Sequence, residues 1–193
     1  MKRIIVIIIL AASVAATASA QSSIGGGYMQ TTYNAVRDGV HASYAGNGAW
    51  AGINACLWLP VHGLYLESGA AWEYAVMAKN YVEGEAKAHY VTVPLRFRYE
   101  YQFTYDYSVF ASAGPSVTYT LAYKETGLDT SVIPLAESRK LDFGAGVELG
   151  AKLFKHLQLK GGYRWGIMNL AAENADGASL RRNVLYAGIA YQF

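Results

Sequence analysis

The chain has little cysteine, few charged residues and, after its first 20 residues, no long apolar run. Its 193 residues include one cysteine, Cys56, so no intrachain disulfide can form, even in an oxidising compartment. Only 16% of the residues are charged, against roughly 25% in an average soluble domain. After residue 20, no apolar run approaches the length of about 20 residues that a membrane-spanning helix requires. The mature chain must therefore be stabilised by something other than disulfides or membrane-spanning helices.

The first 20 residues differ from the rest of the chain. Lys2 and Arg3 precede the apolar run Ile4 to Ala12, and the small residues Ala18-Ser19-Ala20 follow it. This pattern predicts a secretory signal peptide over residues 1–20, cleaved in the mature protein; an uncleaved anchor is the alternative, which the short apolar run disfavours. Lys2 and Arg3 account for the formal net charge of +2, so the mature chain is neutral. A neutral exported chain offers no basic surface to nucleic acid, and no such partner is expected.

Apolar residues alternate with polar or small residues along most of the remaining chain. Every second residue from Leu141 to Leu153 is apolar, and the residues between them are glycine or charged. Successive side chains of a strand point to opposite faces, so a period of two predicts strands with one apolar and one polar face. We expect eight strands, near residues 24–33, 49–59, 64–76, 89–103, 107–123, 139–154, 157–168 and 183–193.

Short and long connections alternate between these strands. Short turns are expected near residues 60–63, 104–106 and 155–156, and longer polar stretches at residues 34–48, 77–88, 124–138 and 169–182. Three turns and four loops join eight strands and leave both chain ends on the short-turn side. That arrangement is typical of outer-membrane barrels. Residues 21–193 are therefore expected to form one all-β, eight-stranded antiparallel up-and-down transmembrane β-barrel.

Alternation alone does not distinguish a membrane barrel from a soluble, lipocalin-like one, because both have a period of two. The interior of eight strands is only wide enough for side chains, and the polar face is rich in Gly, Ser and Ala, which suits a narrow lumen better than a solvated surface. Aromatic residues also gather at the ends of the apolar face, where membrane barrels carry interfacial girdles. The girdle residues are Tyr99, Tyr101, Phe103, Tyr191 and Phe193 at the short-turn end, and Trp72, Tyr74, Tyr119 and Tyr123 at the long-loop end.

Two stretches resemble a known family. The chain ends in Tyr191-Gln192-Phe193, and residues 93–99 read Val-Pro-Leu-Arg-Phe-Arg-Tyr. Together with the leader and the alternation, they resemble the small outer-membrane β-barrel proteins of Gram-negative bacteria, more narrowly the PorT-like and OmpA-like β-barrel domain families. The resemblance implies a place in the cell outer membrane, among outer-membrane lipid and lipopolysaccharide. It also implies that Tyr191 and Phe193 form the signal for the barrel-assembly machinery.

Ten charged residues have the parity of the inner face, five of each sign. Burying unpaired charges carries a large desolvation penalty, so equal numbers favour mutual pairing in a side-chain-filled lumen over an ion-selective constriction. The turn at residues 155–156 places Glu148 opposite Arg164 or one pair off. Pro94 and Pro115 lie at similar heights on adjacent strands and predict a bulge or gap. The ten residues are Glu67, Glu73, Arg96, Arg98, Glu100, Asp142, Glu148, Lys152, Lys160 and Arg164.

One sequence pair is a candidate for catalysis. His41 and Ser43 are the only close His/Ser pair, and they resemble the His-x-Ser element of lipid A deacylases. In that family the pair lies on a late strand facing the bilayer, whereas these residues fall in or beside the first predicted loop. A serine nucleophile also requires a base, an orienting acid and oxyanion donors, which the sequence does not place. The four histidines lack metal-ligand spacing. We therefore expect no catalysis, with His41 and Ser43 as the only suspects, and no metal or cofactor.

These observations predict a non-enzymatic outer-membrane barrel with a structural or surface-interaction role. Four extracellular loops would carry that role, with charged and aromatic residues such as Lys79-Asn80-Tyr81 and Arg181-Arg182 exposed to lipopolysaccharide or an extracellular protein. A small passive pore for ions or solutes is the alternative function. A lipid A-modifying enzyme is the third.

Overall fold

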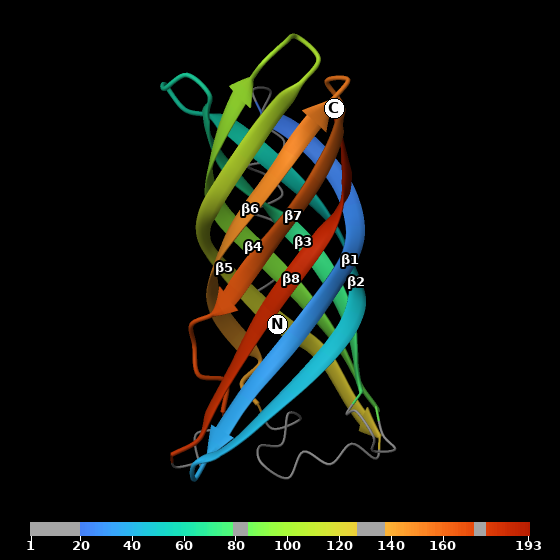
Figure 1. The fold of residues 1–193 in the computed structure, drawn as a ribbon, viewed down its shortest axis with the longest axis vertical. Coiled ribbons are helices and arrows are strands. Elements are labelled where there is room, and N and C mark those ends of the chain that lie inside the picture. The colour runs from blue at the N-terminus through green and yellow to red at the C-terminus, as the bar shows by residue number, and fades with distance from the viewer. Residues whose placement is uncertain (1–19, 79–84, 127–137, 172–176) are drawn as a thin grey trace.

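The computed structural model describes residues 20–78, 85–126, 138–171 and 177–193, which form a closed antiparallel barrel (Figure 1). Each strand pairs with its neighbours in sequence, and β8 closes the sheet onto β1. The predicted all-β, eight-stranded antiparallel fold is confirmed. No helix in the described ranges is long and apolar enough to cross a membrane. The strands are β1 (Ala20–Arg37), β2 (Val40–Trp58), β3 (Leu64–Ala78), β4 (Glu85–Gln102), β5 (Ser108–Thr126), β6 (Leu141–Leu153), β7 (Leu157–Gly166) and β8 (Ser179–Gln192).

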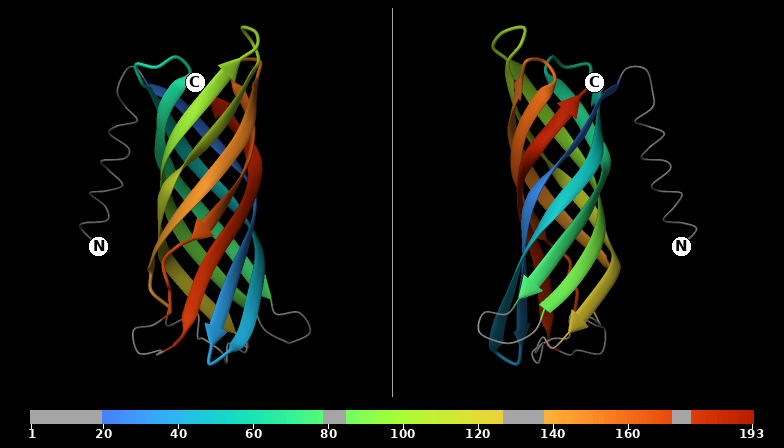
Figure 2. Two further views of the ribbon diagram at one scale, coloured as in Figure 1. Left: turned by 60° about the vertical axis from the view of Figure 1, so that its left-hand side comes forward. Right: turned by 90° about the vertical axis from the view of Figure 1, so that its right-hand side faces the viewer.

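The two ends of the barrel differ in their connections. Residues 59–63, 103–107 and 154–156 form short turns at one end, which we call the turn end (Figures 1 and 2). Ala20 and Phe193 lie at the same end, where the Phe193 amide donates to the Ser22 carbonyl oxygen at 2.9 Å. The opposite end, which we call the loop end, carries the remaining connections. The predicted signal peptide, apart from Ala20, and the Lys79-Asn80-Tyr81 segment lie outside the described residues.

The first connection at the loop end differs from its prediction. Residues 34–48 were expected to form a long loop, and this expectation is wrong: β1 and β2 continue through them, paired as far as Arg37 and Val40. Asp38 and Gly39 alone join the strands, with φ angles of 50° and 77°. Positive φ at both central positions is the geometry of a two-residue type I′ hairpin, for which Asp-Gly is a preferred pair. The polar residues in this stretch lie on the outer face of the extended hairpin.

The outer surface of the barrel is apolar, and aromatic residues lie at its two ends. At the turn end, Tyr101 contacts Phe103 and Tyr191 contacts Phe193, edge to face, with ring centroids 5.0 and 5.4 Å apart. At the loop end, Trp72 stacks on Tyr74 with ring centroids 6.2 Å apart. These positions at the two edges of an apolar band are those of interfacial girdles. Tyr99 and Tyr119 also lie on the outer face by strand parity.

Tyr123 is the exception among the predicted girdle residues. In the β4–β5 ladder Tyr90 pairs with Thr120, but His89 pairs with Ala122, so Leu121 is an extra residue in β5. A bulge of this kind reverses the parity of the strand beyond it. Tyr123 therefore packs against the interior cluster and does not belong to the outer girdle.

The wall of the barrel has a seam around Pro94. The β3–β4 ladder lacks pairs between Ser68–Leu95 and Ala71–Thr92, and the β4–β5 ladder lacks pairs between Pro94–Ser116 and Phe97–Ala113. Proline has no N–H group to donate to a ladder, which accounts for missing pairs on the strands beside Pro94 and Pro115. The Ser68 hydroxyl donates to the Pro94 carbonyl oxygen at 3.0 Å and partly replaces the lost bonding.

Candidate functional site

The inner face of the barrel is the candidate functional site, because it collects most of the charge in the described strands. All ten predicted residues lie on this face, although they come from four different strands. Alternation explains this placement, since inward positions are even on β4, β6 and β7 and odd on β3. The side chains form three connected groups along the barrel axis.

The central group is built around Arg96. Its guanidinium contacts Glu148 Oε2 at 2.9 Å and Glu67 Oε1 at 3.2 Å. The Tyr186 hydroxyl accepts a hydrogen bond from Arg96 at 2.8 Å and donates one to Glu148 at 2.9 Å. Lys160 Nζ lies 3.7 Å from the other oxygen of Glu148. Glu148 thus has two cationic partners and one hydroxyl partner, a degree of pairing that a buried carboxylate requires.

The second group lies nearer the turn end and is built around Arg98. Its guanidinium contacts Glu100 at 3.1 Å and Glu67 at 3.6 Å, and it lies 3.5 Å above the centroid of the Phe110 ring. Glu100 also pairs with Lys152. Glu67 lies between Arg96 and Arg98 and joins the first two groups. The four strands β3, β4, β5 and β6 are therefore connected across the lumen as well as through their ladders.

The third group, nearer the loop end, includes a residue that the sequence analysis misplaced. Arg164 contacts both oxygens of Glu73, at 2.8 and 2.9 Å, and Arg182 contacts one of them at 2.7 Å. Arg182 was expected in an exposed loop, and this expectation is wrong: the residue is 2% exposed. It also donates to Thr31 Oγ1 at 3.1 Å, and its guanidinium lies 3.8 Å above the Tyr90 ring. The cause is that β8 begins at Ser179, four residues before the predicted start, which gives Arg182 inward parity.

The register of β6 and β7 agrees with the second of the two predicted pairings. Arg164 is opposite Gly146 in the ladder and Glu148 is opposite Gly162, so Glu148 and Arg164 are one pair off. Arg164 consequently reaches Glu73 across the lumen, while Glu148 binds Arg96 and Lys160. With Arg182, the interior holds six cations and five carboxylates. Within the described ranges, Asp142 alone among these eleven forms no ion pair, and its Oδ1 has no hydrogen-bond partner.

An apolar cluster adjoins the third group toward the loop end, a feature that the sequence analysis did not anticipate. Tyr33 and Tyr90 meet there, with their hydroxyl oxygens 3.1 Å apart. Leu170, which follows β7, is buried in the same cluster. The Asn169 side chain holds this segment, because its Oδ1 accepts from the amides of Ala171 and Leu180, at 3.0 and 2.8 Å. The other large members of the cluster are Met29, Tyr44, Trp50, Met77, Leu180 and Val184.

A small cavity remains between the ionic groups and the seam in the wall. Its volume is about 50 Å³, and Glu73, Arg96, Glu148 and Tyr186 are among the side chains that line it. A buried water needs roughly 10–15 Å³ of such space, so the cavity suits about three to five waters and no larger solute. The prediction of a side-chain-filled lumen agrees with this geometry.

The suspected catalytic pair lies apart from the interior. His41 and Ser43 are on the outer face of β2 near its loop end, and both are exposed. The Ser43 hydroxyl donates to Asn34 Oδ1 at 3.2 Å. His89 lies in the outer aromatic cluster with Trp72 and Tyr74, and His156 Nδ1 lies 2.8 Å from the Gln192 carbonyl oxygen. Within the described ranges, no three His, Cys, Asp or Glu residues are grouped as a metal site.

Comparisons with known proteins agree with the barrel architecture. A family model described as an outer membrane protein beta-barrel domain matches residues 10–172, most of the chain. None of the curated proteins matches the chain.

Three solved structures illustrate the likeness in fold. The outer membrane protein OprG from Pseudomonas aeruginosa is 13% identical with a TM-score of 0.49, and the match covers 91% of this chain and 96% of that chain. Ail, the attachment invasion locus protein of Yersinia pestis, solved in complex with a heparin analogue, is 14% identical with a TM-score of 0.48, covering 91% and 99%. The outer membrane enzyme PagL is 12% identical with a TM-score of 0.48, covering 86% and 98%.

Proposed function

Because the chain belongs to the outer membrane protein beta-barrel domain family, and therefore lies in the outer membrane of a Gram-negative bacterium, we propose that it is a non-enzymatic barrel acting through its extracellular surface. In this proposal the loop end faces outward, as in other barrels of this kind. The interior supplies rigidity and no transport path. Lipopolysaccharide or an extracellular protein is the expected partner of the exposed loop end, and the barrel-assembly machinery acts during insertion.

One observation carries the proposal: the interior is occupied along its length by the barrel's own side chains. The ionic groups around Arg98, Arg96 and Glu73 follow one another along the axis, and the apolar cluster with Leu170 lies beyond them toward the loop end. An apolar segment of this kind opposes ion passage, because an ion would lose its hydration there without gaining a partner. The passive pore is therefore the less favoured alternative.

Planar-bilayer recording tests the closed interior directly. We expect no stable single-channel steps from the purified, folded protein, because its cavity accommodates only a few waters. A matched pair of variants, Leu180→Ala in the apolar cluster and Leu185→Ala on the lipid face, separates interior from exterior effects. Stable, charge-selective steps from the wild-type protein that change in Glu148→Gln would overturn the proposal in favour of a pore.

The lipid-modifying alternative has less support. The Ser43 hydroxyl bonds to Asn34, and the exposed position of His41 on the outer face leaves the pair without a buried acid beside it in the described residues. Mass spectrometry of lipid A incubated with the same preparation is the matching measurement, and we expect its acyl chains to remain intact. Loss of an acyl chain that disappears in Ser43→Ala would replace the proposal with catalysis.

A further inference from the structure

The cavity in the middle of the barrel is lined by more positive than negative charge. Arg96, Lys160 and Arg164 contribute three cations to its lining, whereas Glu73 and Glu148 contribute two carboxylates. The imbalance extends to the whole interior, where six cations share four carboxylates in ion pairs. Burying charge without a counter-ion is costly, so the excess of positive charge favours an anion in this cavity.

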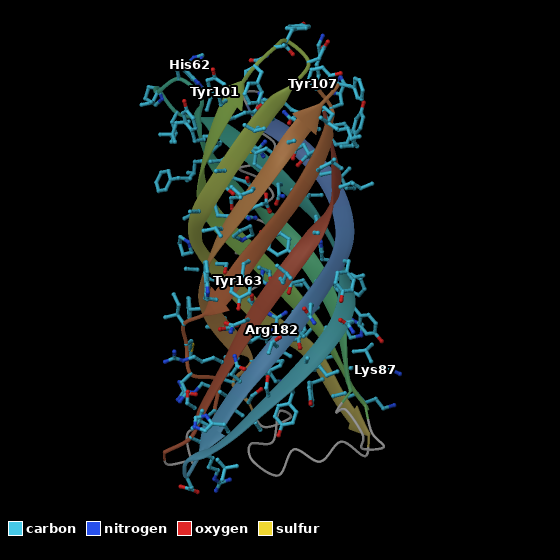
Figure 3. The ribbon with its side chains drawn as sticks, viewed as in Figure 1. His62, Lys87, Tyr101, Tyr107, Tyr163 and Arg182 are labelled. Atoms are coloured by element: carbon cyan, nitrogen blue, oxygen red, sulfur yellow. The ribbon has the colours of Figure 1, made fainter. Side chains whose placement is uncertain are left out.

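The cavity lies far from the solvent at either end of the barrel. Gly146 and Arg164, which both line it, are opposite each other in the β6–β7 ladder. Tyr163, the neighbour of Arg164, marks this height in Figure 3, between the two ends of the barrel. Asp142 is the fifth acid of the interior, but it lies on β6 four residues nearer the loop end than Gly146 and does not line the cavity. The missing counter-ion is therefore expected at the cavity itself.

Two hydrogen-bond donors at the cavity lack a partner. Arg96 Nε and Ser116 Oγ are buried and have no hydrogen-bond partner among the described residues, and both residues line the cavity. Lys160 also keeps donor capacity. Its Nζ lies 3.7 Å from Glu148, and the Asn54 side-chain oxygen, with the amide oriented to satisfy both of its polar atoms, accepts from Nζ at 2.9 Å. Because an ammonium group has three N–H donors, at least one remains for a ligand.

We propose that this cavity binds one chloride ion, held by Arg96, Lys160 and Ser116. Size selects a monatomic anion, because a volume of about 50 Å³ suits a few waters and is too small for phosphate or a carboxylate ligand. A chloride ion is only slightly larger than a water molecule, so one or two waters fit beside it. Such a water can donate to Glu148 Oε1, which accepts no hydrogen bond from the described residues. The ion completes the filled interior and is independent of the surface role in the proposed function.

The dependence of stability on chloride tests the site. The protein is unfolded with urea in lipid vesicles at constant ionic strength, while sodium chloride replaces sodium gluconate, whose anion is too large for the cavity. A ligand that binds only the folded state raises the folding equilibrium constant, so each tenfold rise between about 10 mM and about 500 mM chloride should increase that constant by up to about tenfold. Equal stability in the two salts over this range would overturn the proposal.

Two glycine variants provide a matched comparison that leaves every charge in place. Gly146 faces the lumen, and a Cβ built there has its nearest contact at 3.0 Å, with the Tyr163 carbonyl oxygen. Gly161 faces the lipid, where the nearest contact of a Cβ is at 3.4 Å. Gly146→Ala narrows the cavity by a methyl group and should raise the dissociation constant for chloride by about tenfold, which corresponds to about 1.4 kcal/mol. Gly161→Ala should keep the wild-type value, and equal values in the two variants would exclude this cavity as the site.

Bromide diffraction locates the ion even if a variant fails to fold. Crystals of the wild-type protein grown in sodium bromide should give an anomalous peak inside the cavity, within hydrogen-bond reach of Arg96 and Lys160. Peaks at the surface alone, or waters alone in the cavity, would overturn the proposal. Lys160→Gln should lose the peak, whereas Lys152→Gln, which removes a lumen cation away from the cavity, should keep it. Channel recordings remain a separate test, because stable single-channel steps would refute the closed interior whether or not bromide occupies the cavity.

Discussion

At the scale of single residues, Glu73 shows how the interior depends on partners from distant parts of the chain. Arg164 and Arg182 contact the same carboxylate from β7 and β8, although Glu73 belongs to β3. The three residues are not equivalent. Removing Glu73 leaves the buried Arg182 and the partly buried Arg164 without their counter-ion, whereas removing Arg182 leaves Glu73 with Arg164 and leaves an apolar site beside Tyr90.

This asymmetry gives a prediction about stability. Glu73→Gln should lower the free energy of unfolding by about 3–5 kcal/mol, the cost of leaving a buried charge unpaired. Arg182→Met should cost clearly less, because methionine fits the adjoining apolar cluster. The double variant should cost less than the sum of the two single variants. Urea-dependent folding into lipid vesicles, followed by tryptophan fluorescence, measures all three, and equal costs for the two single variants would contradict the pairing.

The face on which each charged residue lies could be predicted from the sequence, but its contacts could not. Parity placed all ten predicted charged residues on the inner face, because the alternation depends only on neighbours in sequence. Their contacts depend on how far the strands are staggered around the barrel, which is why Arg164 meets Glu73 and not Glu148. Two consecutive arginines at 181 and 182 did contain a usable signal, since one of any two neighbours on a strand must face inward.

At the scale of elements, the β1–β2 hairpin departs most from the sequence-based prediction. The apolar signal of a membrane strand comes from lipid, so it ends at the membrane edge even where the strand continues. Asn34 and Ser43 are polar for that reason, and the stretch around them has the composition of a loop while it pairs as a sheet. The Asp38-Gly39 pair was the one local feature that predicted a tight hairpin instead.

The hairpin gives a second prediction. Gly39 has a φ of 77°, and a Cβ built there meets nothing within 4 Å, so Gly39→Val introduces backbone strain without a clash. We expect a loss of about 1–2 kcal/mol in unfolding free energy, and faster tryptic cleavage after Arg37 than in the wild type. Asp38→Asn, which also tolerates positive φ, is the matched control and should behave as the wild type. Rapid cleavage of the folded wild-type protein at Arg37 would indicate a mobile loop in place of the hairpin.

At the scale of the whole molecule, the barrel sorts its side chains into an apolar exterior and a filled interior. Val147 is at the middle of β6 and is 41% exposed on the outer face. Val147→Arg would place a charge near the bilayer midplane and should cost about 2–4 kcal/mol. Thr32→Arg, also on the outer face but beyond the aromatic level, should cost about 1 kcal/mol or less. Folding titrations in lipid vesicles compare the two, and similar costs would contradict the placement of the membrane.

Closure of the sheet has a further consequence for biogenesis. The last of the eight barrel strands in sequence order, β8, completes the hydrogen bonding of β1 and brings Arg182 to a carboxylate 109 residues earlier in the chain. A nascent chain that lacks β8 therefore exposes an unpaired strand edge and an incompletely neutralised acid at the same time. Truncated products would be poor substrates for insertion and ready targets for periplasmic proteases, so the ring of strands acts as its own check on completeness.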